Sequence, residues 1–232
     1  MWLPYDPRPD FDLSQLTYQE WLTYLFDRPV GDQVFWEEID QYDSWRDLAE
    51  PATIVQHLQR TCLEHKAILK TYSREQVDQG LWWILCESLF HCGRTLFDAT
   101  VKLDLRSQCI ESMYHVYSDV VATTEGDAQD TVYWMWWDFV GREDEEWQFG
   151  KPEVDRLSED RRQIAEVIIR TLAKILELPN KRCQWAALHG LGHLDHQPKA
   201  REIVQSYLDV HGPELSDDDR KWVQACREGK IM

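Results

Sequence analysis

The sequence predicts an all-α protein that folds as a single domain over residues 1–232, and three observations lead to this prediction. Apolar residues recur at three- and four-residue spacing, and no segment alternates as a strand would. Only 10 residues are glycine. Hydroxyl residues and prolines stand where helix starts need them. The expected helices, joined by short polar connectors, span residues 14–27, 32–42, 51–71, 74–97, 104–123, 130–140, 158–178, 181–195, 198–211 and 216–228.

The starts of the N-terminal helices carry capping signals. Thr17 and Glu20 form a Thr-x-x-Glu capping box, in which each side chain can accept a hydrogen bond from the other residue's backbone N–H. Pro51 suits the first turn of 51–71, where the N–H that proline lacks has no helical partner in any case. Ser73 and Gln76 repeat the capping pattern before 74–97. Apolar spacing alone predicts the helices at 32–42 and 104–123.

The C-terminal half shows the same signals. Ser158 is the expected N-cap of 158–178, Pro198 suits the first turn of 198–211, and Ser216-x-x-Asp219 starts the last helix. Apolar spacing predicts the helices at 130–140 and 181–195. The stripe is clearest in 158–178, where one face carries Ile164, Val167, Ile168, Thr171, Leu172 and Ile175.

Charge restricts the partners that the protein can bind. The chain has 42 acidic and 25 basic residues, which gives a formal charge of −17 and a pI near 4.8. Such a chain repels nucleic acid and anionic lipid, so no nucleic-acid or membrane partner is expected and the predicted partner is a basic protein. A hydrophobic content of 43%, with 12 tryptophans, excludes disorder.

The cell compartment predicted from the sequence is the cytoplasm. Residues 1–10 are acidic and rich in proline, unlike an export signal. The longest apolar runs, 81–86 and 132–137, are far shorter than the roughly 20 residues of a membrane-spanning helix. The six cysteines form no Cys-x-x-Cys pair, and we expect them to be reduced, buried side chains.

A family resemblance appears near the C-terminus. The segment Cys183-Gln-Trp-Ala-Ala-Leu-His-Gly-Leu-Gly-His193, followed by Pro198 and an amphipathic helix through Tyr207, is similar to a HEAT-like repeat. Residues 108–115 echo residues 182–189, with cysteine, a small residue and histidine at matching positions. The resemblance implies a HEAT-like α-solenoid of antiparallel helix pairs, with 181–229 as the last repeat and its cap.

Three histidines are the metal-ligand candidates in the sequence. His189 and His193 are four residues apart and share a helix face, and His196 follows three residues later. The general-base glutamate of zinc peptidases would stand at Gly190, so this pattern predicts no hydrolytic centre. The packing alternative places His189 inside the protein, like its echo His115, and exposes the other two. We therefore predict no metal and no cofactor.

Two enzyme families built on HEAT-like stacks differ from this chain in their functional residues. Deoxyhypusine hydroxylases hold iron with His-Glu dipeptides, which this sequence lacks. HEAT-like alkylpurine DNA glycosylases use Trp and Asp in a basic groove, and the surrounding charge here is acidic. Phosphate-binding loops and nucleophile elbows are also missing from the sequence. The sequence therefore predicts no catalytic residues.

Acidic and aromatic residues are concentrated in one window, 119–160. It holds 13 acidic and 3 basic residues and four of the tryptophans. Tryptophan anchors protein interfaces, and carboxylates attract a basic partner. The alternative is that the tryptophans belong to the core and the acids to a solvated loop. The predicted partner-binding residues are Trp134, Trp136, Trp137, Asp138, Glu143, Asp144, Glu145, Glu146 and Trp147.

These features together favour an immunity protein that binds and neutralises a cognate basic toxin. This hypothesis rests on the similar character of bacterial immunity proteins, which are often small, acidic and without catalytic groups. One alternative is a helical-repeat adaptor that holds a protein partner without inhibiting it. Another is a metal-dependent hydrolase that uses the cluster of His189, His193 and His196.

Overall fold

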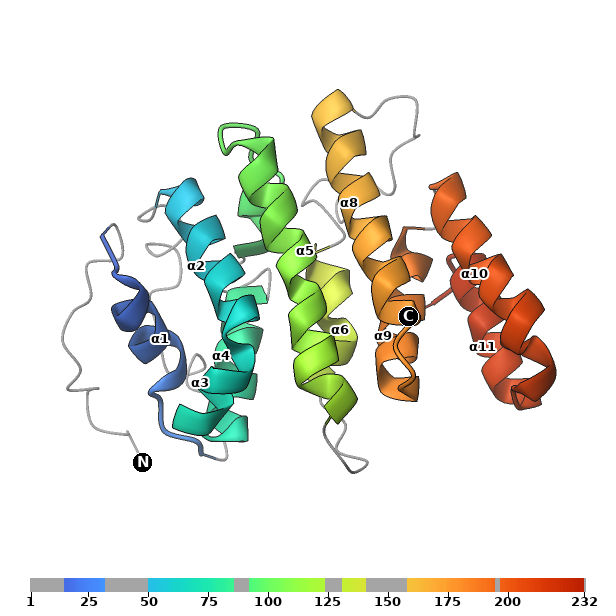
Figure 1. The fold of residues 1–232 in the computed structure, drawn as a ribbon, viewed down its shortest axis with the longest axis horizontal. Helices are drawn as coiled ribbons and strands as arrows, with labels where there is room; N and C mark the ends of the chain where they lie inside the picture. The colour runs from blue at the N-terminus through green and yellow to red at the C-terminus, as the bar shows by residue number, and fades with distance from the viewer. Residues whose placement is uncertain are drawn as a thin grey trace.

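The protein is helical throughout the part that the computed structural model describes, which comprises residues 15–31, 50–85, 92–123, 131–140, 158–194 and 197–231 (Figure 1). The all-α prediction is confirmed for these residues. The expected helix at 32–42 lies outside them. The α-helices are α1 (Tyr18–Phe26), α2 (Pro51–Leu63), α3 (His65–Thr71), α4 (Arg74–Leu85), α5 (Leu103–Asp119), α6 (Thr131–Val140), α8 (Glu159–Leu176), α9 (Lys181–His193), α10 (Pro198–His211) and α11 (Asp217–Arg227); short 3₁₀ helices span Cys92–Leu96, Val121–Thr123 and Gly212–Glu214.

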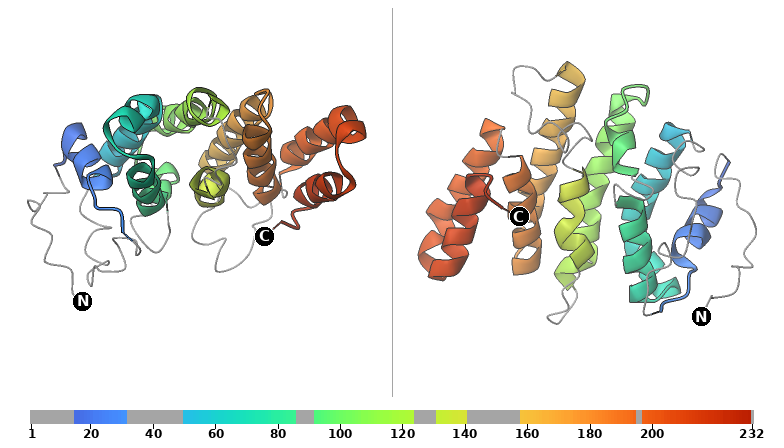
Figure 2. Two further views of the ribbon diagram at one scale, coloured as in Figure 1. Left: turned by 90° about the horizontal axis from the view of Figure 1, so that it is seen from below. Right: turned by 180° about the vertical axis from the view of Figure 1, so that it is seen from behind.

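The helices lie in two layers, which Figure 2 shows most clearly in the view from below. In one layer, which we call the outer layer, α2 packs on α5, α5 on α8, and α10 lies beside α8. In the other, the inner layer, α4 packs on α6, α6 on α9, and α9 on α11. Contacts between α8 and α9 and between α10 and α11 join the layers.

Most helix starts follow the predicted caps. Thr17 and Glu20 form the complete capping box of α1. The Ser158 hydroxyl accepts the Arg161 N–H at the start of α8, and the Ser216 hydroxyl accepts the Asp219 N–H at the start of α11. Pro51 and Pro198 lie in the first turns of α2 and α10. Ser73 and Gln76 exchange their predicted hydrogen bonds as well.

Three of the predicted helices differ from a single α-helix. In 74–97, α4 covers residues 74–85, residues 92–96 form a 3₁₀ helix, and residues 86–91 lie outside the described part. The segment 51–71 divides at Glu64 into α2 and α3, and the new helix turns His65 into the core. The segment 104–123 ends its α-helix at Asp119 and continues as a 3₁₀ turn, because the Thr123 amide and hydroxyl bond to the carbonyls of Val120 and Asp119. Apolar spacing does not detect such breaks, since the apolar face continues across them.

Large aromatic side chains fill much of the core. Trp21, Trp83, Trp136 and Trp137 are fully buried. Three of their indole N–H groups have partners: Trp21 donates to the Thr61 hydroxyl at 3.0 Å, Trp83 to the Tyr24 hydroxyl at 3.1 Å, and Trp136 to the Met113 sulfur at 3.2 Å. These contacts offset the cost of burying the indole donors.

A buried arginine connects α5 to the start of α8. The Arg106 side chain is 1% exposed and donates two hydrogen bonds to Asp160, at 2.9 and 2.5 Å. It also donates to the carbonyls of Val101 and Leu96. The hydrogen bond from Arg106 lowers the pKa of the Asp160 carboxyl below its ordinary value. This bidentate contact fixes the first turn of α8 against α5.

Cys62, Cys109, Cys183 and Cys226 are buried free thiols, as predicted. Burial raises the pKa of Cys62 and Cys226 to about 12 and that of Cys183 to about 11, so these thiols stay protonated at neutral pH.

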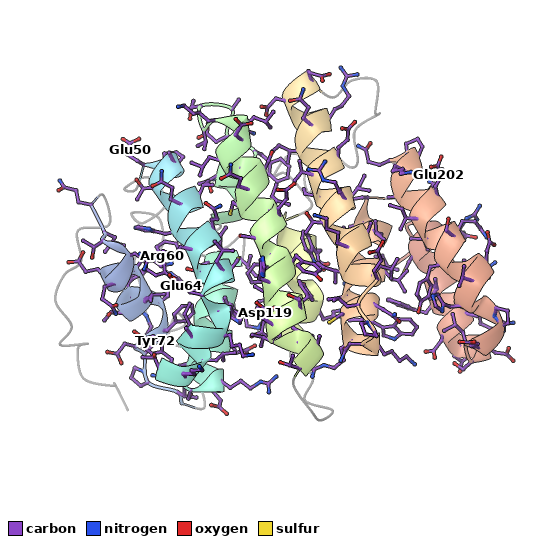
Figure 3. The ribbon with its side chains drawn as sticks, in the orientation of Figure 1. Glu50, Arg60, Glu64, Tyr72, Asp119 and Glu202 are labelled. Carbon is purple, nitrogen blue, oxygen red and sulfur yellow. The ribbon has the colours of Figure 1, made fainter. Side chains whose placement is uncertain are left out.

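Apart from buried groups such as Arg106, charged side chains lie on the exposed faces of the helices (Figure 3). One such pair joins Arg60 on α2 to Glu64 at the end of that helix, where Arg60 Nε lies 2.8 Å from Glu64 Oε1. In the part of the chain that the structure describes, no helix is both long enough and apolar enough to cross a bilayer.

Candidate functional site: an aspartate and two histidines between α6 and α9

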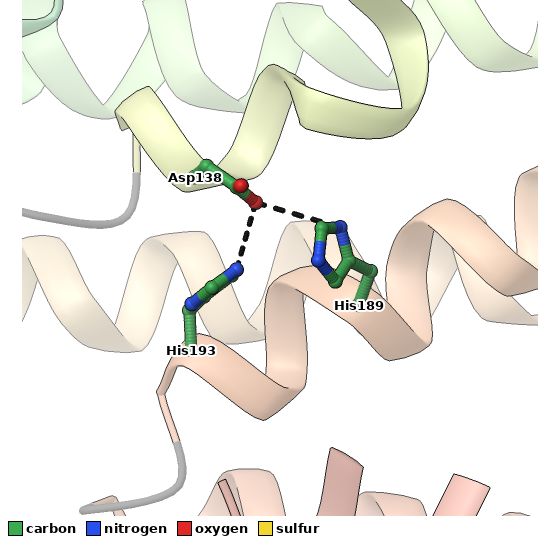
Figure 4. A group of neighbouring side chains, drawn as sticks. All are labelled: Asp138, His189 and His193. Carbon is green, nitrogen blue, oxygen red and sulfur yellow. Dashed lines mark ion pairs between the residues drawn. The ribbon is translucent and has the colours of Figure 1, made fainter. Parts of the chain in front are cut away.

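Three ionisable side chains meet between α6 and α9, and we call them the Asp-His-His cluster: Asp138, His189 and His193 (Figure 4). The two histidines come from α9, whose first turn is capped by the Asn180 side chain through the amides of Arg182 and Cys183. Four residues apart on a helix, they lie on the same face. Asp138 points at both of them from the neighbouring α6.

The carboxylate is central to the cluster. Asp138 Oδ1 lies 2.8 Å from His193 Nε2 and 3.4 Å from His189 Nδ1. His189 Nδ1 is also 3.3 Å from the carbonyl oxygen of Trp134, one turn earlier on α6. One ligand atom from each of the three residues lies within 4.8 Å of the others. Two imidazoles and a carboxylate at this spacing can bind a transition-metal ion, or share a proton between Asp138 and His193.

The cluster is closed to solvent. The side chains of Asp138, His189 and His193 are 6%, 0% and 5% exposed. Burying three such groups has a large desolvation cost, because the interior solvates charge poorly. A charge on one of these three groups is therefore stable only if an opposite charge lies beside it in the cluster.

Glycine allows α9 to approach this closely. A Cβ atom on Gly190 would lie 2.6 Å from the Trp137 Cβ and 2.9 Å from a Leu172 methyl group. A Cβ on Gly192 would lie 3.1 Å from the backbone of Cys226 on α11. Gly190, which stands where zinc peptidases have their glutamate, is thus needed for α9 to pack closely against α6 and α8.

An aromatic group continues from the cluster across the inner layer. Trp134 stacks on His189 with ring centroids 4.7 Å apart, and Trp222 lies 5.3 Å from Trp134. Trp185 lies 5.2 Å from Trp222, with the Lys181 ammonium 4.7 Å from its ring centre. Trp134, Trp185 and Trp222 are each partly exposed, and we call them the tryptophan triad.

The partner-binding residues predicted from the sequence separate into three groups. Trp136 and Trp137 belong to the core, with 0% exposure, and Asp138 belongs to the Asp-His-His cluster. Trp134 keeps a partly exposed position on the inner layer. Residues 143–147, which are Glu143, Asp144, Glu145, Glu146 and Trp147, lie outside the described residues. The alternative that the tryptophans belong to the core is therefore correct for Trp136 and Trp137.

The histidine predictions are corrected in two respects. His193 was expected to be partly exposed at a fraying helix end and is buried, because α6 covers it and Asp138 faces it. His189 is buried as its packing alternative required, but its echo His115 is 46% exposed beside Asp119 on α5. The two segments of the echo therefore lie in different layers, on α5 and on α9, and their histidines have different surroundings. His196 lies outside the described residues.

Sequence reasoning did not pair Asp138 with the histidines. The residue lies 51 positions before His189, and only the packing of α6 on α9 brings the two together. One signal was available: Asp138 is the single charged residue in the apolar segment 132–140. A charge in such a segment, in a helix that is buried, needs a partner.

The outer layer also carries a depression, of about 660 Å³, between α2, α5 and α8. Its lining includes both acidic and basic groups, among them Glu111, Lys174 and Glu177. This mixture of charges selects no class of ligand. Comparison of the chain with protein-family models, with curated proteins and with solved structures gave no match.

Proposed function

We propose that this chain is a HEAT-like α-solenoid that binds a basic protein partner through its inner layer, as an immunity protein does when it neutralises a cationic toxin. Two layers of successive helices support the solenoid interpretation, because HEAT-like repeats stack helix pairs in this way. Each pair buries its apolar face against its neighbours and leaves a continuous inner surface for a partner.

The observation that carries the proposal is the tryptophan triad. It brings together indoles from α6, α9 and α11 that the core has not fully buried. Partly exposed tryptophans supply much of the binding energy of protein interfaces. Their faces also attract the cationic side chains of a basic partner, as the position of Lys181 over Trp185 illustrates within this chain.

Carboxylates adjoin the triad. α11 begins with three aspartates, of which Asp217 and Asp218 have side chains 89% and 97% exposed. Asp218 lies one helical turn before Trp222, on the same face of α11. The acid-rich segments 124–130 and 141–157 precede and follow α6, which carries Trp134. Charge of this sign speeds the encounter with a basic protein and positions it over the indoles.

A rescue experiment tests the proposal. The gene beside that of this chain is cloned, and the toxicity of its product is measured with and without co-expression of the wild-type protein. We expect rescue by the wild type and weaker rescue when Glu143 to Glu146 are replaced by Ser or when Trp222→Ala removes one indole. Leu63→Ser is the matched control, because Leu63 is 51% exposed on the outer layer.

Binding of the purified proteins provides the second measurement. The association rate should fall steeply with added salt, because steering between opposite charges is screened. A neighbouring gene whose product is harmless, or a complex unaffected by salt and by both inner-layer replacements, overturns the proposal. A complex that forms without any inhibition favours the adaptor alternative.

A further inference from the structure

We infer that the Asp-His-His cluster is a binding site for one divalent transition-metal ion of the Zn²⁺ class, which cross-links α6 to α9. The sequence alone predicted no metal, because Gly190 stands where the zinc-peptidase pattern has glutamate and because packing could account for the histidines. The third ligand comes from the fold. This site is independent of the proposed partner binding and requires no toxin.

Distances between the ligand atoms fit a shared ion. Ligand atoms about 2.0 to 2.1 Å from one tetrahedral zinc ion lie about 3.3 to 3.4 Å apart, and octahedral neighbours about 2.9 Å apart. The observed separations from Asp138 Oδ1 are 3.4 Å to His189 Nδ1 and 2.8 Å to His193 Nε2. All three ligand atoms lie within 4.8 Å of one another.

The types of ligand select the class of metal. Imidazole nitrogens suit Zn²⁺, Fe²⁺, Co²⁺ and Ni²⁺, whereas Ca²⁺ takes six to eight oxygen ligands and Mg²⁺ keeps several waters. Two imidazoles and one carboxylate supply two nitrogens and at least one oxygen. The cluster is therefore a poor calcium or magnesium site and a good transition-metal site.

A proton held between Asp138 and His193 is the competing occupant, and the geometry disfavours it. Within the described part of the chain, Asp138 Oδ1 accepts no aligned hydrogen bond, although His193 Nε2 is 2.8 Å away. A hydrogen-bonded ion pair at this distance would place the N–H on the line to the oxygen. Poor alignment at close range is expected when both atoms are directed at a third atom.

The surroundings hold the ligands in place. The His189 ring is held in place by its stack on Trp134, with ring centroids 4.7 Å apart. Close packing at Gly190 sets the separation of α6 and α9. Because the ligands are almost fully buried, we assign the ion a structural role, in which its binding stabilises the folded chain.

Metal content and melting temperature test the inference on the full-length chain without any partner. The protein is stripped with chelator and titrated with Zn²⁺, and metal per chain is measured by mass spectrometry. We expect one Zn²⁺ per chain and a melting temperature about 5 to 10 °C higher at a free Zn²⁺ concentration 100 times Kd. Asp138→Asn and His193→Gln should weaken binding by about 100-fold or more.

His115→Gln is the matched control, because it removes an exposed histidine that also lies near an aspartate. This variant should bind Zn²⁺ as the wild type does. A wild-type chain that takes up no Zn²⁺ overturns the inference, as does undiminished binding by folded Asp138→Asn or His193→Gln protein. If both variants fail to fold, X-ray absorption of the Zn²⁺-loaded wild type decides: two imidazoles with a carboxylate support the site, and any other ligand set overturns it.

Discussion

Stability below neutral pH should depend on one buried histidine. The His65 side chain is 1% exposed, and its Nε2 lies 2.8 Å from the Tyr133 hydroxyl. Burial lowers the pKa of His65 from 6.5 to about 4, because the interior disfavours the charged imidazolium. The folded chain therefore holds His65 neutral, whereas the unfolded chain binds a proton near pH 6.5.

The sign and the size of the effect follow from this difference in pKa. Between pH 6.5 and 4 the unfolded state binds more protons, so the free energy of unfolding falls as the pH falls. The stabilisation is fully present above pH 6.5 and is lost progressively toward pH 4. For pKa values of 6.5 and about 4, linkage gives a loss of about 2 kcal/mol between pH 7 and pH 5.

Urea denaturation in chelator at pH 7 and pH 5 measures this loss, followed by circular dichroism. We expect His65→Gln to lower stability at pH 7 and to reduce the difference between the two pH values by about 2 kcal/mol. His115→Gln serves as the comparison, because it makes the same substitution at a side chain that is 46% exposed. Equal pH dependence of His65→Gln and the wild type would refute the reasoning.

Three further predictions concern helix packing and helix ends. Gly190→Ala should cost about 1 to 3 kcal/mol, because the new methyl group overlaps the neighbouring helices, while Gly212→Ala, with no heavy atom within 4 Å, should be tolerated. Asp160→Ala should cost about 2 to 4 kcal/mol, because it leaves the buried Arg106 guanidinium without its carboxylate. Ser158→Ala should cost about 1 kcal/mol through loss of the α8 cap. Chemical denaturation measures each change.

Matched variants separate these causes from general damage. Glu111→Ala breaks an exposed pair with Arg170 and should change stability by less than about 1 kcal/mol. Ser206→Ala removes an exposed serine from within α10 and should have little effect. If the Glu111 variant loses as much stability as the Asp160 variant, or Gly212→Ala as much as Gly190→Ala, the explanation from burial or close packing is wrong.

The positions of most helices could be predicted because their signals are local. A cap such as Thr17 or Ser158 and an apolar stripe such as that of α8 depend on residues within one or two turns. The division of 51–71 at Glu64 could not be predicted, because nothing within the segment interrupts its apolar face. The break serves a distant contact, since it places His65 against Tyr133 of α6.

The candidate site was only half visible in the sequence. His189 and His193 could be grouped by their spacing on one helix, but Asp138 joins them through packing between layers. The segment around Asp138 also led to a wrong prediction, because tryptophans are common both in protein interfaces and in protein cores, and the sequence does not show which environment they have. Burial separates Trp136 and Trp137 from the partly exposed Trp134, and it depends on which face of α6 meets α9.

The order of the helices in the two layers has a consequence for folding kinetics. The most extensive packing joins helices that are well separated in the chain: 39 residues lie between α2 and α5 and between α5 and α8, and 40 between α6 and α9. Each of these contacts closes a loop, and the entropic cost of closure rises only slowly with the number of residues in the loop. The contacts α2–α5, α5–α8 and α6–α9 therefore close loops of nearly equal entropic cost, so loop closure gives none of them a large advantage in forming first.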